Sequence, residues 1–463
     1  MARKNRRRTV SSSQKGGFFR KFFLTIFFLM VAAAAVSGFI LFETSPPNLS
    51  LGKQLHFLGG NVELPITVSD QQSGIRSIEV TLEQGDQRSQ LFNRSFQRQA
   101  WFTDAGPKSV SETLLIDTNK ARLKDGEAAL VIRVRDFSLN GMLKGNETSQ
   151  NIAVIIDSKP PRVSVNHAQQ YIRPGGSGII LYTLSEPVER HGVQIDEHFF
   201  RGFPLGQSGK QFIAYIALPW DSPEPNQSKV IAVDEAGNEG KAVFTMRYKP
   251  IPEKKDRINV SNGFLKNKMP QIAEHYPEMS GNLVERYLYI NNTIRQKNAE
   301  TIKAICQTSE PERLWSGRFG RMAGARKADF ADQRTYFYQG QPIDHQTHLG
   351  IDLASTARAE VRAANRGKVV FADYLGIYGY MIILDHGQGV FSLYSHLSRL
   401  ETSVGSLVEK DQYMGNTGAT GMAGGDHLHF SMLIQGIFVT PIEWWDRHWI
   451  EVNIDAFIGN NQS

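Results

Sequence analysis

Two histidines stand two residues apart near the C-terminal end of the chain, where the sequence reads GGDHLHFSM. Residues i and i+2 of a β-strand point to the same face, so His427 and His429 would project together while Leu428 packs on the opposite side. A pair of imidazoles on one face suits the binding of a metal ion or the transfer of protons. The pair indicates a metal or catalytic site only if other strands place further metal-binding or acid–base side chains beside it.

Two upstream segments offer such partners. In THLGIDLAS, strand spacing places His348 and Asp352 on one face, with an apolar face behind them. In VFSLYSHLS, the same alternation places Ser392, Tyr394 and His396 on one face of another strand. Three separate strands are therefore each expected to present His or Asp from a polar face.

This set of side chains favours zinc. Zinc accepts imidazole and carboxylate ligands, and a catalytic zinc keeps three protein ligands and one position open for water. The His and Asp of HLGID and one His of HLH supply that number, with Gly350 leaving space between the first two, and two histidines remain for acid–base work. The chain contains no HExxH motif, so a histidine with a pKa near 6.5 would replace the glutamate base of that motif.

Residues 345–447 resemble the lysostaphin-type (LytM-like) zinc metallopeptidases, which cut peptides of bacterial cell-wall peptidoglycan. The resemblance rests on HLGID, LYSHLS and the glycine-rich approach GNTGATGMAGGDHLHF, which follow one another in the family's order. It implies that zinc is bound by His348, Asp352 and His429. It also implies that His396 and His427 flank the water and the scissile carbonyl, sharing the roles of base and transition-state stabiliser.

One position departs from the family's pattern. Gly425-Asp426 stands where family members usually have Gly-Pro before His-Leu-His. Asp426 could hydrogen-bond a nearby histidine and hold its tautomer, or it could be a turn residue. Neither alternative puts a predicted zinc ligand in doubt.

Short alternating strands fill most of the chain before this region. From 43 to 249, runs such as NVELPITVSD and KVIAVDEAGN have the period of two that is typical of β-sandwiches. VIRVRDFSLNG and VIAVDEAGNEG look like the ends of two repeated units, and both resemble bacterial immunoglobulin-like domains. We therefore expect two sandwiches, with a boundary near DSKPPR.

The character of the sequence changes after Pro250, where a short linker leads to a helical pattern. These helices either pack on a neighbouring domain or form a regulatory segment that covers the active site. The β pattern then returns, and no long helix is expected in the antiparallel β domain at the C-terminal end.

The N-terminal segment combines a basic tail with an apolar run. Eight Lys and Arg residues without an acid occupy 1–21, while the whole chain carries +6, so the remainder is close to neutral. This distribution argues against a nucleic-acid-binding protein. Residues 22–42 are long enough to cross a membrane, with the N-terminus in the cytoplasm, and a cleaved signal peptide is the alternative.

The expected fold is mainly β. The predicted parts are a cytoplasmic basic tail (1–21), a transmembrane helix (22–42), two immunoglobulin-like β-sandwiches (43–158 and 159–249), a helical linker or regulatory segment (250–315) and a lysostaphin-type zinc peptidase domain (316–463).

The expected function is that of a zinc metalloendopeptidase, anchored in the bacterial inner membrane by one helix, whose periplasmic domain cuts peptidoglycan stem peptides or crosslinks. The alternative is a non-catalytic activator or scaffold for other cell-wall hydrolases. The immunoglobulin-like domains would be the place for cell-wall or division partners.

Overall fold

A computed structural model describes residues 16–100, 105–121 and 123–458. Its first helix, α1 (Gly16–Leu41), contains an apolar span at Phe19–Phe39 that is long enough to cross a membrane and is not buried against protein. This span overlaps the transmembrane segment predicted at 22–42, and a signal sequence would have the same character. Residues 1–15 of the predicted basic tail lie outside the described residues.

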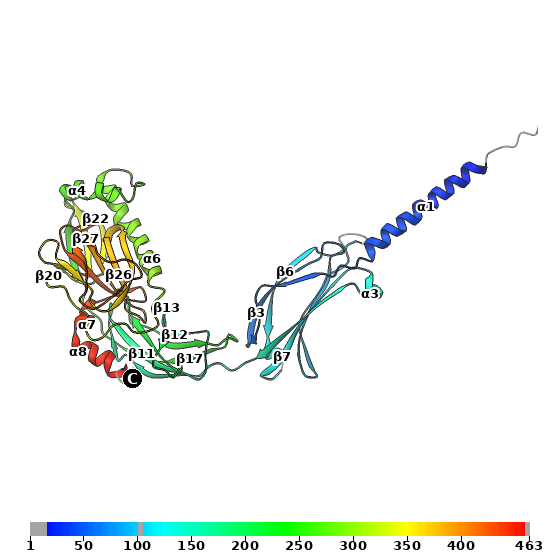
Figure 1. The fold of residues 1–463 in the computed structure, drawn as a ribbon, viewed down its shortest axis with the longest axis horizontal. Helices are drawn as coiled ribbons and strands as arrows, with labels where there is room; N and C mark the ends of the chain where they lie inside the picture. The colour runs from blue at the N-terminus through cyan, green and yellow to red at the C-terminus, as the bar shows by residue number, and fades with distance from the viewer. Residues whose placement is uncertain (1–15, 101–104, 122, 459–463) are drawn as a thin grey trace, which may run out of the picture. The chain divides into compact units, whose positions relative to one another are not determined.

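A β-sandwich follows α1 within the same compact unit (Figure 1). One of its sheets has the order β1 (Asn48–Leu51), β3 (Asn61–Ser69), β6 (Ser109–Asp117), and the other has the order β2 (Phe57–Leu58), β8 (Glu147–Ile156), β7 (Gly126–Asp136), β4 (Ile75–Gln84), β5 (Gln87–Ser95). Short helices α2 (Thr118–Ala121) and α3 (Asn140–Leu143) lie in its loops.

The strand alternation expected from the sequence builds this sandwich. Along β3, buried and exposed residues alternate without interruption until its last residue, because only one face of the strand meets the other sheet. Leu64 and Val68 of β3 share one core with Val80 of β4 and Ile132 of β7. Its membership of the immunoglobulin-like group stays a prediction.

A second sandwich belongs to the other compact unit. Its sheets have the orders β14 (Phe203–Pro204), β15 (Gln211–Ala217), β11 (Ser177–Leu184), β9 (Val163–Ala168) and β13 (His198–Arg201), β12 (Arg190–Ile195), β16 (Ser228–Val233), β17 (Glu239–Val243), and β10 (Tyr171–Ile172) pairs with β18 (Arg247–Tyr248).

The segment expected to be a helical linker begins with a strand. β19 (Lys254–Asn259) pairs in parallel with β21 (Asp332–Tyr338), which pairs with β22 (Gln341–His348) in a three-stranded sheet. The linker expected after Pro250 is therefore shorter than expected, because a strand of five polar or charged residues and one isoleucine gives little hydrophobic signal. The predicted helices follow as α4 (Asn262–Ala273), α5 (Leu283–Tyr289), η1 (Ile290–Ile294) and α6 (Arg295–Ile305).

Local signals start these helices. Asn282 caps α5 in a capping box with Glu285, and Ser261 accepts a hydrogen bond from a backbone N–H of α4. The helices pack on the C-terminal sheet, with Ile294 and Ile302 in one core with Ile383.

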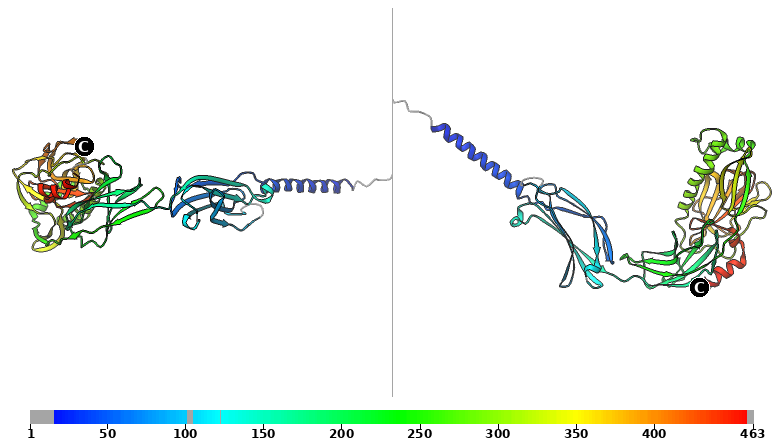
Figure 2. Two further views of the ribbon diagram at one scale, coloured as in Figure 1. Left: turned by 90° about the horizontal axis from the view of Figure 1, so that it is seen from below. Right: turned by 180° about the vertical axis from the view of Figure 1, so that it is seen from behind.

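The C-terminal domain is built on a ten-stranded antiparallel sheet, and Figure 2 gives two further views of it. Its central order is β20 (Ala325–Ala328), β23 (Ile351–Ala354), β30 (Leu428–Ile434), β27 (Val390–Leu400), β26 (Gly379–Asp385), β25 (Gly367–Leu375), β28 (Leu407–Val408), with β24 (Glu360–Arg362), β29 (Tyr413–Thr417) and β31 (Ile437–Val439) attached to it. Short helices α7 (Pro441–Trp445), α8 (Arg447–Ile450) and α9 (Ala456–Ile458) follow. The mainly β fold expected from the sequence is confirmed.

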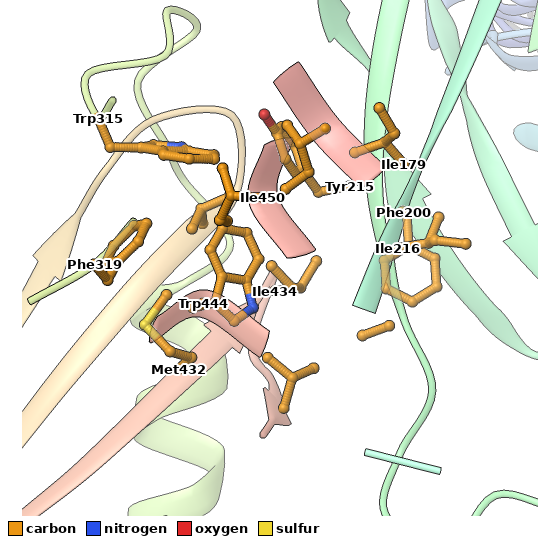
Figure 3. Close-up of a cluster of buried hydrophobic side chains, with 14 of the residues drawn as sticks. Ile179, Phe200, Tyr215, Ile216, Trp315, Phe319, Met432, Ile434, Trp444 and Ile450 are labelled. Atoms are coloured by element: carbon orange, nitrogen blue, oxygen red, sulfur yellow. The ribbon is translucent and has the colours of Figure 1, made fainter. Parts of the chain in front are cut away.

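Trp444 joins the second sandwich to the C-terminal domain. Its fully buried ring lies against Trp315 and Phe319 on one side and near Tyr215 of β15 on the other (Figure 3). Its indole N–H donates to the Ser177 hydroxyl, 3.1 Å away. The two domains therefore share one hydrophobic core.

Candidate active site

Three strands from two sheets bring the predicted zinc ligands together. His348 is the last residue of β22 in the three-stranded sheet, whereas Asp352 lies in β23 of the ten-stranded sheet. The expectation that both lie on one strand was wrong, because the chain passes from one sheet to the other between them. Asp352 pairs directly with His429 of β30, so neighbouring strands fix that half of the group.

One side-chain atom from each of the three residues lies within 3.0 Å of the other two. The distances are 3.0 Å from His348 Nε2 to Asp352 Oδ1, 2.9 Å from His348 Nε2 to His429 Nδ1, and 2.9 Å from His429 Nδ1 to Asp352 Oδ1. The centre of this triangle is nearer to its corners than a zinc–nitrogen bond of about 2.0–2.1 Å, so one ion above the centre can contact all three atoms.

Hydrogen bonds determine which ring nitrogen of His348 and of His429 carries a lone pair that can bind a metal. Nδ1 of His348 lies 2.8 Å from the carbonyl of Asp329, which can only accept, so in the neutral ring Nε2 carries the lone pair. Ser431 donates its proton to the carbonyl of Leu349 and therefore accepts from Nε2 of His429, 3.1 Å away. Nδ1 of His429 is left with its lone pair.

The charge state agrees with this arrangement. Burial lowers the pKa of His429 to about 4, so its ring is neutral at neutral pH. Burial alone would raise the pKa of Asp352, but its interactions with His348, His427 and His429 outweigh burial and hold that pKa well below its ordinary value. Three lone pairs about 3 Å apart repel one another unless a cation lies between them, so this group fits a metal ion.

Gly350 makes this approach possible, for a reason other than the expected one. A Cβ at this position would lie 2.4 Å from Nε2 of His429 and 2.6 Å from the Ser431 hydroxyl. The glycine therefore makes room for the ring of His429 and the Ser431 hydroxyl, rather than for the His348–Asp352 pair.

His396 reaches the same site through a bulge in β27. Two residues, Ser395 and His396, oppose the single Met381 of β26, and His396 has a left-handed φ of 63°. Its ring centroid lies 4.9 Å from that of His427 and 5.8 Å from that of His429. The expectation that it shares a face with Ser392 and Tyr394 was wrong, since those two hydroxyls bond each other inside the sheet's core, and Ser392 also bonds His386.

His396 and His427 both present Nε2 to the site. Nδ1 of His396 lies 2.9 Å from the carbonyl of Thr420, and Nδ1 of His427 lies 2.8 Å from that of Gly425. Burial and the neighbouring histidines lower the pKa of His396 well below its ordinary value. Burial acts to lower the pKa of His427 too, but its interaction with the Asp352 carboxylate outweighs this effect and raises that pKa.

Asp426, the departure from the family's pattern, serves as a turn residue. Its carboxylate accepts hydrogen bonds from the Thr417 hydroxyl and from the backbone N–H of Arg358. It holds the loop before β30.

The site opens into a cleft of about 950 Å³. Tyr287, Asn291 and Arg295 of the helical segment line it together with all five predicted site residues. The helices thus pack on the sheet, as one of the two alternatives expected, and they also form a wall of the cleft, while a regulatory role stays a prediction. Arg334 of β21, not singled out from the sequence, lies 3.3 Å from Asp352 Oδ2 through Nη2.

Comparison with known proteins places this geometry in a family. Residues 346–441, which include all five site residues, match Peptidase family M23. The C-terminal domain is an M23 peptidase domain. The resemblance to lysostaphin-type enzymes is thereby confirmed.

Relatives of the M23 domain carry different activities in their names. The chain is 30% identical over 156 residues to the murein hydrolase activator EnvC of Escherichia coli K12, covering 33% of this chain and 37% of that protein. It is 36% identical over 107 residues to the DD-carboxypeptidase/endopeptidase Mpg of Neisseria meningitidis serogroup B, covering 23% of this chain and 25% of that protein. The chain thus spans between a quarter and two fifths of these relatives.

A solved structure, the catalytic domain of the antimicrobial peptidase lysostaphin from Staphylococcus simulans, matches with a TM-score of 0.23 and 25% identity. The match covers 26% of this chain and 92% of that chain.

Proposed function

We propose that the M23 domain is a zinc-dependent endopeptidase that hydrolyses peptide bonds in the stem peptides or crosslinks of bacterial peptidoglycan. The observation that carries this proposal is the convergence of lone pairs from His348, Asp352 and His429 at one point of an open cleft. The similarity to a protein named as a DD-carboxypeptidase/endopeptidase supports the substrate class.

The five site residues would divide the chemistry between them. Zinc bound by His348, Asp352 and His429 would act as a Lewis acid and lower the pKa of a coordinated water from about 15.7 toward 7. His396 is buried and neutral, so its Nε2 can accept a proton. His427, with its pKa raised by Asp352, can donate one from Nε2 to the developing oxyanion or to the leaving amine.

The helix α1 bears on where in the cell the M23 domain lies. We propose that it anchors the chain in the inner membrane with its N-terminus in the cytoplasm, so that the M23 domain lies in the periplasm. The two sandwiches would then be available to cell-wall or division proteins.

Digestion of purified peptidoglycan tests this function. The full chain in detergent should release peptides whose mass identifies the bond that is cut, and a zinc chelator should stop the release until zinc is restored. If the His396→Ala and His427→Ala variants release as much peptide as the unaltered chain, the proposed roles of these two histidines are contradicted.

A second candidate is a non-catalytic activator of other cell-wall hydrolases, which the similarity to EnvC favours. In that case the purified chain releases nothing by itself, but it increases the release caused by a periplasmic extract. The His427→Ala variant should then stimulate the extract as well as the unaltered chain does.

A further inference from the structure

Three carboxylates lie together in the first compact unit, outside the M23 domain. Glu43 follows α1, Asp70 follows β3, and Asp136 ends β7. One carboxylate oxygen from each lies within 4.8 Å of the others. All three residues are buried, with 5%, 6% and 0% of their surfaces exposed.

No basic side chain balances these acids among the described residues, because none of the ion pairs formed there includes any of the three. Oε2 of Glu43 is buried without a hydrogen-bond partner, although Oε1 accepts from the Ser73 hydroxyl. A buried carboxylate oxygen that lacks a partner is costly, and two further carboxylates beside it add repulsion. Among the residues that the structure describes, no positive charge is paired with this group.

The protein holds the carboxylates in place instead of separating them. Asp70 Oδ1 accepts from the backbone N–H of Gly74 at 2.7 Å, and Asp136 accepts from the backbone and side-chain N–H groups of Asn146 at 2.7 and 2.8 Å. These hydrogen bonds keep three buried carboxylates close together, although no basic side chain among the described residues pairs with them.

We propose that Glu43, Asp70 and Asp136 form a calcium-binding site. The group offers oxygen ligands without nitrogen or sulfur, which selects a hard cation over zinc. Calcium binds six to eight oxygens at about 2.3–2.6 Å, so oxygens on opposite sides of one ion can be nearly 5 Å apart, and the three carboxylates can reach the same ion. Backbone carbonyls and water complete such a shell.

The position of Glu43 gives this site a consequence. Glu43 is two residues beyond the end of α1, and its backbone carbonyl accepts hydrogen bonds from Ser138 and Asn146 in the loop after β7. A bound ion adds a second connection between the chain leaving α1 and two loops of the sandwich. Calcium thereby stiffens the junction between the apolar helix and the first domain.

Calorimetric titration of the full chain tests the site. The protein, purified in detergent, loaded with zinc and freed of calcium on a chelating resin, is titrated with CaCl2 and separately with MgCl2. The unaltered chain should bind one calcium ion, and Glu43→Gln and Asp136→Asn should each weaken binding at least tenfold. Asp86→Asn, an exposed acid in the turn between β4 and β5, is the matched control and should bind as the unaltered chain does.

Hydrogen exchange of the unaltered chain gives a second measurement that does not depend on how the variants fold. Calcium should slow exchange at 43–47, 70–74 and 136–146. The proposal is overturned if no calcium binds up to about 5 mM, above the range of extracellular calcium modules. It is equally overturned if magnesium binds as tightly, if Glu43→Gln and Asp136→Asn keep full affinity, or if protection appears only at 348–429.

Discussion

Ser431 accepts a hydrogen bond from Nε2 of His429, 3.1 Å away, because its own proton is given to the carbonyl of Leu349. This bond leaves Nδ1 of His429 as the only nitrogen of the ring that can bind a metal. Groups that orient a metal-binding histidine contribute substantially to affinity. We expect Ser431→Ala to bind zinc about 10–100 times more weakly, measured by competition with a chromophoric chelator.

Ser395→Ala is the matched control for that experiment. Ser395 is buried and pairs with His429 across the two strands, but its hydroxyl has no hydrogen-bond partner. Its loss should leave zinc affinity unchanged. Equal losses in the two variants would mean that packing, and not the tautomer of His429, determines affinity.

The two histidines of the HLH motif should differ in what their loss removes. His429→Ala removes a ligand atom and should lose the metal. His427→Ala should keep the metal, but its rate of hydrolysis should fall about 10²–10⁴-fold. Atomic absorption on both purified variants measures the metal. Equal zinc loss in both would overturn this division of roles.

Gly350→Ala should damage the metal site and leave the rest of the domain folded. The new Cβ would meet His429 Nε2 at 2.4 Å, so the ring must leave the position in which its Nδ1 lies beside Asp352 Oδ1, at a cost of about 1–3 kcal/mol. We expect weakened zinc binding with an unchanged circular dichroism spectrum. Gly424→Ala, at another position lining the cleft, has no atom within 4 Å of its new Cβ and should bind zinc normally.

The acidic group of the first sandwich should make stability depend on pH when calcium is absent. The folded-state pKa of Glu43 is about 7, above its ordinary value of 4.5, so the folded protein binds more protons than the unfolded chain between these values. This contribution to stability is present at low pH and is lost as the pH rises from 4.5 to 7. The gain in melting temperature from Glu43→Gln, measured by calorimetry, should therefore be larger at about pH 7.5 than at about pH 5. A gain that is the same at both pH values would contradict the shifted pKa.

The sequence allowed much of this architecture to be predicted, because alternation with a period of two follows directly from one-sided burial of strands. The spacing in HLGID and HLH, together with the family resemblance, selected the three residues whose ligand atoms converge. Their role as zinc ligands stays a prediction.

Other features depend on approaches between distant strands, which a single sequence does not encode locally. The bulge that turns His396 toward His427 breaks the alternation on which its expected face was based. The position of Arg334 beside Asp352 depends on how two sheets meet. The group around Glu43 joins residues up to 93 positions apart that no motif connects.

The shared core around Trp444 has a consequence for the inheritance of these domains. Glu443, next to it, accepts hydrogen bonds from Arg173 and Ser177 of the second sandwich, and the indole itself bonds Ser177. A recombination event that exchanged the peptidase alone would leave an indole and a carboxylate facing an unmatched neighbour. Over evolutionary time the second sandwich and the peptidase should therefore be transmitted and diversified as a pair.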